Sequence, residues 1–302
     1  MCHSFAPKYR GLHVTLSGLD QNKRLTVIAW AIIPTENAAF YERAFDIWFG
    51  LKDSSGQPIL RSWLNSPDHV QMSDRDKGII TMQKKLFPNA LHFHCTEHII
   101  DNCRKASTGK YHDGLIWGIQ ASKTEDKYNK NLANLRSKCP SAADYLAHIP
   151  AESWCLWPHI KTRSLHGSRT NKIAESANAM NMPIRRMEPL YAMDQLTRNQ
   201  LRSYSERLVA ARIRKFKGEL LTEYAQSEYS IQASLAMDYL VEVATIVPLM
   251  SNRVSPQERH YVDLDSLQCT YGYSMQYQLP CNDMIMFASI RRDLQDYQAW
   301  VQ

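Results

Sequence analysis

The chain has 302 residues, of which 44% are hydrophobic and 22% are charged, as in an ordinary globular protein with one large domain or two small ones. The longest apolar run, residues 25–33, is too short to cross a bilayer, and the first residues lack the apolar core of a secretion signal. Seven scattered cysteines predict free thiols in a reducing, intracellular compartment and argue against a disulfide framework.

The net charge of +6 is unevenly distributed along the chain. Residues 161–217 contain thirteen Lys and Arg and four Asp and Glu, a local balance of +9, so the rest of the chain is near −3. Such a block indicates a polyanionic partner, most often nucleic acid. Long helices also often carry a solvated basic face, and charge alone leaves the two interpretations equal.

Two strands joined by a turn are predicted near the start of the chain. Apolar and polar residues alternate over 12–16, as in a half-buried strand. After a turn at 19–24, residues 25–33 are apolar on both faces, which predicts a strand in the interior of a sheet. Residues 36–49 then favour a helix that Gly50 ends.

Residues 69–105 read as strand, helix, strand, helix. The first strand leads to Asp74, the helix after it stops before Pro88, and the second strand covers 91–95. This order predicts an α/β core, in which functional residues gather where strands meet helices.

The remainder of the chain is mainly helical by its pattern. Strand signals vanish over about 106–160, which predicts a helical insertion, and 188–247 read as long helices interrupted at Gly218. Residues 260–290 are rich in strands and turns and end in a short helix.

Two carboxylates are candidates for metal binding. Asp74 follows a strand, although an aspartate at such a place is more often a helix cap. Glu175 lies off the apolar stripe of Ile173, Ala177 and Met180, so periodicity alone favours a solvated surface residue. A two-metal centre for phosphoryl transfer needs carboxylates gathered from distant parts of a chain, which keeps the pair open as a hypothesis.

Cysteine and histidine spacing offers two weaker candidates. Cys95 and His98 form a C-x2-H pattern, and Cys269 and Cys281 lie at a ligand-like separation. A structural zinc site wants four ligands and each pattern supplies two. For Cys95 and His98 we therefore favour packing slightly over metal binding.

Three stretches, in order, resemble one family, the Mutator-like element (MULE) transposases. Residues 9–37 resemble the family's second and third strands, 73–103 the segment with the second catalytic Asp and a C-x2-H element, and 154–178 the segment with the catalytic Glu. The resemblance spans most of 8–180. The family core is RNase H-like, carries a DDE carboxylate triad and is interrupted by a helical insertion.

The resemblance implies an RNase H-like α/β fold with a mixed sheet, and metal-dependent DNA strand cleavage and transfer. Asp74 and Glu175 would be the second and third triad members and would hold Mg²⁺ or Mn²⁺. The first triad Asp and its central strand belong ahead of the region matching 3–9 and are absent from this sequence. Asp20 is several strand residues from that site and is not expected to replace the Asp. The chain is therefore expected to be catalytically incomplete.

DNA is the partner that the resemblance implies, with the nucleus as the location, and a homo-oligomer stays open. The basic segment would contact phosphates through five residues: Arg185, Arg186, Arg212, Arg214 and Lys215. The alternative is a non-catalytic DNA-binding protein, domesticated from a transposase, or a transposon remnant.

The C-terminal segment is similar to the SWIM zinc finger, whose pattern is C-x-C, a spacer, then C-x-H. Cys269 and Cys281 match the first and third ligands, but Tyr271 and Asp283 replace the second Cys and the His. Three ligands at best do not close a structural site, so we expect no tight zinc binding.

The predicted organisation is therefore a transposase-like core over 1–180 with the insertion at 106–160. A helical region over 181–250 and a degenerate SWIM-like segment over 251–302 follow.

Overall fold

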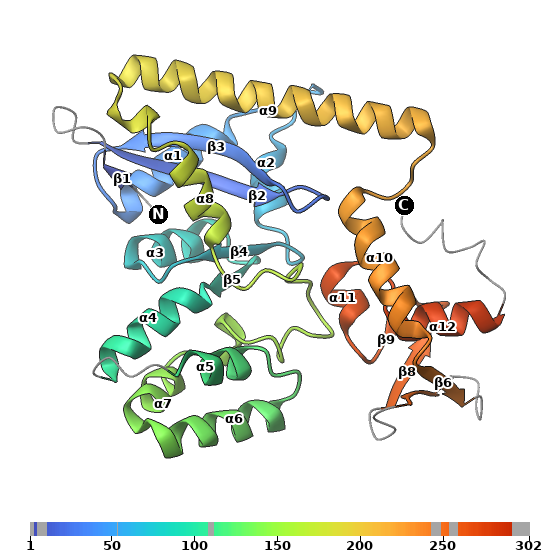
Figure 1. Cartoon of the computed structure of the whole chain (residues 1–302). Helices are drawn as coiled ribbons and strands as arrows, with labels where there is room; N and C mark the ends of the chain where they lie inside the picture. The colour runs from blue at the N-terminus through green and yellow to red at the C-terminus, as the bar shows by residue number, and fades with distance from the viewer. Residues whose placement is uncertain are drawn as a thin grey trace. The chain divides into compact units, whose positions relative to one another are not determined.

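The computed structural model describes residues 3–4, 11–52, 54–107, 112–242, 249–253 and 259–291. The fold is mixed α/β (Figure 1), as predicted. The chain divides into two compact units: unit 1 has its residues within 1–19, 25–159 and 168–203, and unit 2 within 20–24, 160–167 and 204–302. The chain passes between the units at several points, of which the last, between 203 and 204, lies inside one long helix and none lies at the predicted boundary of 180.

The first sheet of unit 1 is antiparallel, with strand order β1-β2-β3. Strands β2 (Leu12–Leu19) and β3 (Leu25–Ile33) pair along their whole length, with a bulge between Leu16 and Ser17. The short strand β1 (His3–Ser4) pairs only with the first two residues of β2. Both long strands lie where the alternation and the apolar run predict them.

One face of this sheet is covered by helices α1 (Ala38–Phe49), α2 (Ile59–Leu64) and α3 (Lys77–Leu86). Helix α1 begins at an Asn37 cap, whose side chain accepts the N–H of Phe40, and ends at Gly50. Phe45, Trp48 and Phe87 form the aromatic centre of the core beneath the sheet.

The other face of β3 is covered by the turn η2 (Ile184–Arg186) and the first part of helix α9 (Pro189–Lys217). Ala192 and Leu196 pack against Trp30 and Ile32 of the strand. Strand β3 is thus apolar on both faces because helices cover both. It lies at an edge of the described sheet, so the predicted interior position is wrong.

Unit 1 also contains a parallel pair of strands, β4 (Val70–Ser73) and β5 (Leu91–His94). Helix α3 connects them and α4 (Thr96–Ala106) follows β5, so the predicted strand–helix–strand–helix order is confirmed. The two strands form a sheet of their own among the described residues.

The segment of about 106–160, predicted as a helical insertion, is helical in its described part. It contains α5 (Asp113–Gln120), α6 (Glu125–Lys138), α7 (Pro140–Ala147) and the turn η1 (Ala151–Ser153). These helices share one core with α4, built around the fully buried Trp154 and Leu146. Helix α8 (Lys172–Met180) follows.

Unit 2 contains the end of α9 and helix α10 (Glu223–Ala236), separated at Gly218, which has a φ of 70°. Strands β6 (Tyr239–Glu242), β7 (Leu249–Asn252), β8 (Arg259–Asp263) and β9 (Gln268–Cys269) form an antiparallel sheet in chain order. Helices α11 (Tyr273–Tyr277) and α12 (Asn282–Arg291) complete it. Within 260–290, strands β8 and β9 lie in the first part and helices α11 and α12 cover most of the rest. The prediction of a strand-rich segment is therefore confirmed only for its first part, and α12 is the predicted final helix.

One helical prediction is corrected at the end of α10. The predicted helices extend to 247 and the predicted helical region to 250, whereas β6 begins at Tyr239 and β7 at Leu249. The sequence there is a short apolar run, which has no periodicity to separate a strand from a buried helix. Pairing with β7 decides in favour of a strand.

The shared core of the helical insertion gives the first testable prediction. Leu146 is 0% exposed there, so Leu146→Ala removes buried methyl groups and leaves a cavity. We expect it to lower the free energy of unfolding by about 3 kcal/mol, measured by urea denaturation. Leu51 is 58% exposed, and Leu51→Ala should change stability by less than about 0.5 kcal/mol. Equal effects of the two variants would contradict this core.

Candidate functional site

Asp74 lies at the carboxyl end of the β4–β5 pair. Ser73 and His94 are the last paired residues, and the N–H of Cys95 then donates to the carbonyl oxygen of Ser73 at 2.9 Å. Asp74 and Cys95 therefore leave the two strands side by side. This is the edge at which parallel strands of α/β proteins present functional side chains.

The carboxylate of Asp74 does not cap the following helix. Asp76 takes that role, since its Oδ1 accepts the N–H of Ile79 at 3.0 Å. Asp74 is half-buried, and its Oδ1 accepts the N–H of Asp76 at 3.2 Å. Asp76 is therefore the helix cap, and Asp74 lies in the turn before it.

Glu175 is brought to the same strand ends by the chain segment that begins α8. The N–H of Asn171 donates to Sγ of Cys95 at 3.4 Å, and the N–H of Thr96 donates to the carbonyl oxygen of Arg169 at 3.1 Å. Glu175 lies one helical turn later, with its N–H on the Asn171 carbonyl oxygen. Asp74 and Glu175, 101 positions apart, therefore flank the same residue, Cys95.

The far end of α8 is fixed to the first sheet. The hydroxyl of Thr15 in β2 donates to Oδ1 of the buried Asn178 at 3.2 Å. Glu175 is half-buried, which disfavours the solvated-surface interpretation, and Met180, predicted to lie on the apolar stripe, is 70% exposed. The helix is therefore buried mainly through Ala177 and Asn178.

Burial and nearby charges shift the pKa values of two groups at these strand ends, His94 and Cys95. Burial, and to a smaller extent the neighbouring Arg75 guanidinium, lower the pKa of His94 to about 4. Burial raises the pKa of the Cys95 thiol, and the negative charge of Glu175 also raises it. A buried thiol with a raised pKa is a poor nucleophile, so Cys95 acts here through its hydrogen bonds.

Neither predicted metal pair at this edge gains a third partner. Among the described residues, no group of three His, Cys, Asp or Glu ligand atoms lying within 4.8 Å of one another includes Asp74 and Glu175, or Cys95 and His98. The packing role that we favour for Cys95 and His98 stays a prediction. The roles of Asp74 and Glu175 stay predictions.

Asp20 has a structural role in the β2–β3 turn. Its Oδ1 accepts the backbone N–H groups of Asn22 and Arg24, and its Oδ2 pairs with the guanidinium groups of Arg24 and Arg207. These contacts hold the β2–β3 turn together, and the expectation that Asp20 does not join a metal site stays a prediction.

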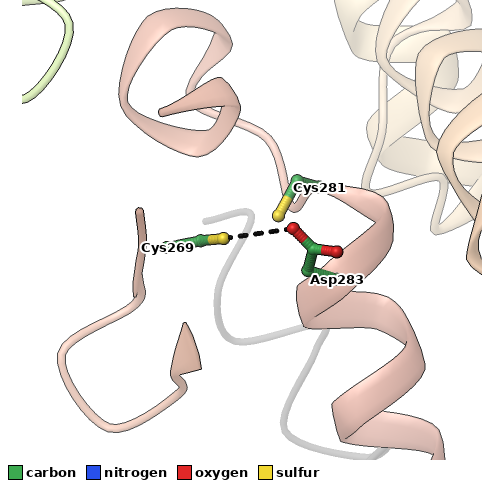
Figure 2. Close-up of side chains that lie close together, drawn as sticks. All are labelled: Cys269, Cys281 and Asp283. Atoms are coloured by element: carbon green, nitrogen blue, oxygen red, sulfur yellow. Dashed lines mark hydrogen bonds between the residues drawn. The ribbon is translucent and has the colours of Figure 1, made fainter. Parts of the chain in front are cut away.

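A second candidate site lies in unit 2, where Cys269, Cys281 and Asp283 converge (Figure 2). Their ligand atoms all lie within 4.8 Å of one another, and all three residues are buried. Sγ of Cys269 donates to Oδ2 of Asp283 at 3.5 Å, and Nδ1 of His260 lies 2.9 Å from the same oxygen. The Cys281 thiol and burial raise the pKa of the Cys269 thiol.

Turns on either side deliver these side chains. Cys269 ends β9, and the chain reverses at Gly272, whose φ is 80° and whose N–H bonds back to the Cys269 carbonyl oxygen. A Cβ on Gly272 would lie 2.6 Å from Cγ1 of Ile160, so glycine is required there. Cys281 directly precedes α12, and Asp283 lies in its first turn.

Sequence spacing alone missed His260. It lies in β8, nine positions before Cys269, and is outside the SWIM-like pattern. The pairing of β8 with β9 aligns Val262 with Cys269, and His260 then lies against the ring of Tyr271 and beside Asp283. The sequence therefore indicates a place for His260 in this site only when the register of the β8–β9 hairpin is already known.

The predicted DNA-contacting residues lie in both units. Arg185 and Arg186 belong to η2 in unit 1, where Arg186 is exposed and the side chain of Arg185 lies outside the described part. Arg212, Arg214 and Lys215 belong to the α9 segment of unit 2. Arg212 and Lys215 are exposed, whereas Nη1 of Arg214 is buried without a hydrogen-bond partner among the described residues.

Comparison of the chain with models of known protein families finds no match, and comparison with curated proteins finds none either. None of the described helices combines the length and apolar character that crossing a membrane requires.

The environment of His94 gives the second prediction. Because its folded pKa of about 4 lies below the ordinary 6.5, neutral His94 stabilises the fold above pH 6.5, and this contribution is lost as pH falls from 6.5 toward 4. We expect proton NMR of the chelator-treated chain to find His94 titrating near pH 4. Arg75→Gln should raise that value, while the exposed, distant Arg61→Gln should not. Titration of His94 near pH 6.5 would contradict the burial described.

Proposed function

We propose that this protein is a DNA-binding protein derived from DDE-type transposases, with an RNase H-like core that keeps two of the triad carboxylates and does not cut DNA alone. The observation that carries the proposal is the placement of both Asp74 and Glu175 next to Cys95 in the fold. A strand end and a distant helix supply the two acidic groups, as phosphoryl-transfer centres require.

The strand arrangement supports the RNase H-like interpretation. The family layout places its first strand between the second strand and the strand that leads to Asp74. Among the described residues, β2 has a partner on that side only at Leu12 and His13, and β4 pairs only with β5. In the family layout, the first strand would pair with β2 and β4 in that place.

The non-catalytic interpretation rests on the ligand set. A two-metal centre holds its ions about 3.5–4 Å apart and needs oxygens from several carboxylates. Within the described part of the chain, Asp74 and Glu175 belong to no group of three ligand atoms. Two acidic groups can attract a cation, but they do not hold two ions in place for strand cleavage.

The basic segment supports DNA as the partner. Its exposed Arg212 and Lys215 lie on one helix and are available to neutralise phosphates. Other members are already paired within the protein, Arg207 with Asp20 and Arg198 with Asp194. Sequence-independent DNA binding is therefore expected to depend more on Arg212 and Lys215 than on the paired arginines.

DNA binding gives the third prediction. We expect the affinity for a random DNA duplex, measured by fluorescence anisotropy from about 50 to about 200 mM salt, to fall steeply with salt through counterion release. The double variant Arg212→Gln, Lys215→Gln should weaken binding at least about tenfold and reduce the salt slope by about 2, since two phosphate contacts are lost.

The matched control removes the same charge elsewhere. Lys127→Gln with Lys130→Gln changes two exposed residues of α6 and should leave the affinity and slope close to those of the parent chain. Equal losses in both double variants would point to net charge alone, and affinity independent of salt would overturn the proposal.

DNA cleavage gives the fourth prediction. In a supercoiled-plasmid nicking assay with Mn²⁺, the chain should produce no nicks above background, because two carboxylates do not complete the metal centre. Nicking that Asp74→Asn and Glu175→Gln each abolish would restore the enzyme interpretation. Nicking that survives both substitutions would indicate a contaminant.

A further inference from the structure

We infer that Cys269, Cys281 and Asp283 bind one zinc-class divalent cation (Figure 2), and that His260 is a positioning residue which orients the Asp283 carboxylate. This inference goes beyond DNA binding and stands independently of it. It also revises our expectation from spacing alone, because His260 and the burial of Asp283 become visible only in the fold.

The incomplete hydrogen bonding of the buried Asp283 is the first reason to expect a cation. Its carboxyl group is 0% exposed, yet its Oδ1 has no hydrogen-bond partner among the described residues. Leaving a buried carboxyl group partly unsatisfied is costly unless a cation or a further donor compensates it. Its other oxygen, Oδ2, points toward the two sulfur atoms.

The chemistry of the three ligands fits zinc better than magnesium or calcium. Thiolates and carboxylates both bind zinc, whereas magnesium and calcium prefer oxygen ligands alone. Cation binding would displace the proton through which Cys269 now donates to Asp283. Zinc sites with three protein ligands complete their coordination with water.

The surroundings favour the anionic ligands. Cys281 precedes α12 and Asp283 lies in its first turn, where the helix dipole stabilises negative charge. The N–H of Tyr271 donates to Sγ of Cys269 at 3.4 Å. Tyr271, which stands where the SWIM-like pattern would have a second Cys, places its ring against His260 at a centroid distance of 5.0 Å.

His260 acts behind the carboxylate. Its Nδ1 lies 2.9 Å from Oδ2 of Asp283, and the histidine is not among the three residues whose ligand atoms lie mutually within 4.8 Å. Ligating carboxylates are commonly held in this way by an outer hydrogen bond, whose loss weakens metal binding about 10–100-fold.

The small core around the cluster gives the cation a structural purpose. Six buried residues form that core, and two of them are the cysteines: Met250, Val262, Cys269, Cys281, Met284 and Phe287. One ion would join the end of β9 to the start of α12. Small modules with little core commonly depend on such a link.

The test is a Co²⁺ titration of the full chain, reduced and freed of metal by a chelator. Binding of one Co²⁺ per chain should produce a sulfur-to-cobalt charge-transfer band, which Zn²⁺ then removes by competition. Zn²⁺ should also raise the midpoint of thermal unfolding of the apo chain. All of these readouts are independent of DNA, so failure here would leave the proposed function untouched, and the reverse also holds.

Variants assign the ligands. Cys281→Ser and the isosteric Asp283→Asn should each weaken Co²⁺ binding at least 100-fold, with circular dichroism verifying that each variant is folded. His260→Ala should weaken it about 10–100-fold with an unchanged charge-transfer band. His260→Asn, which keeps a donor for Asp283, should restore most of the affinity.

The rival cysteine provides the matched control. Cys95→Ser removes the C-x2-H sulfur and should leave stoichiometry and band unchanged. Loss of the band in Cys95→Ser, its absence in the parent chain, or an unchanged affinity in Asp283→Asn would each overturn the inference. Equal affinity of His260→Ala and the parent chain would overturn the positioning role.

Discussion

The arrangement of unit 1 around Asp74 and Glu175 depends on the hydrogen bonds of Cys95. Its N–H extends the β4–β5 ladder by one bond to Ser73, and its sulfur accepts the N–H of the buried Asn171. A buried N–H left without an acceptor costs about 1–3 kcal/mol. The sulfur thus holds the start of α8 at the strand ends, and the position of Glu175 follows from it.

Much of the secondary structure could be predicted because local patterns and tertiary environment agree. The alternation in β2 and the continuous apolar run of β3 both predict strands. In the structure β2 packs on the core through one face, and β3 is covered on both faces. The pattern fails at β6, where four apolar-rich residues fit a helix or a strand equally and only pairing with β7 decides.

The candidate sites could be predicted only in part, since contact between distant residues has no local signature. Asp74 and Asp76 are two positions apart, and nothing in their spacing says which of them caps α3. Glu175 is half-buried on a helix whose start is bonded to Cys95 through Asn171, and periodicity reports neither fact. His260 reaches Asp283 only through the register of β8 and β9.

One side-chain amide forms hydrogen bonds with the edge strand of the first sheet. Nε2 of Gln200, on α9, donates to the carbonyl oxygens of Val27 and Ile28 in the edge strand β3, at 3.1 Å each. Unsatisfied carbonyl groups on an edge invite a strand from another molecule. Gln200 occupies the carbonyl groups of Val27 and Ile28, so a strand from another molecule that paired with them would first have to displace this amide.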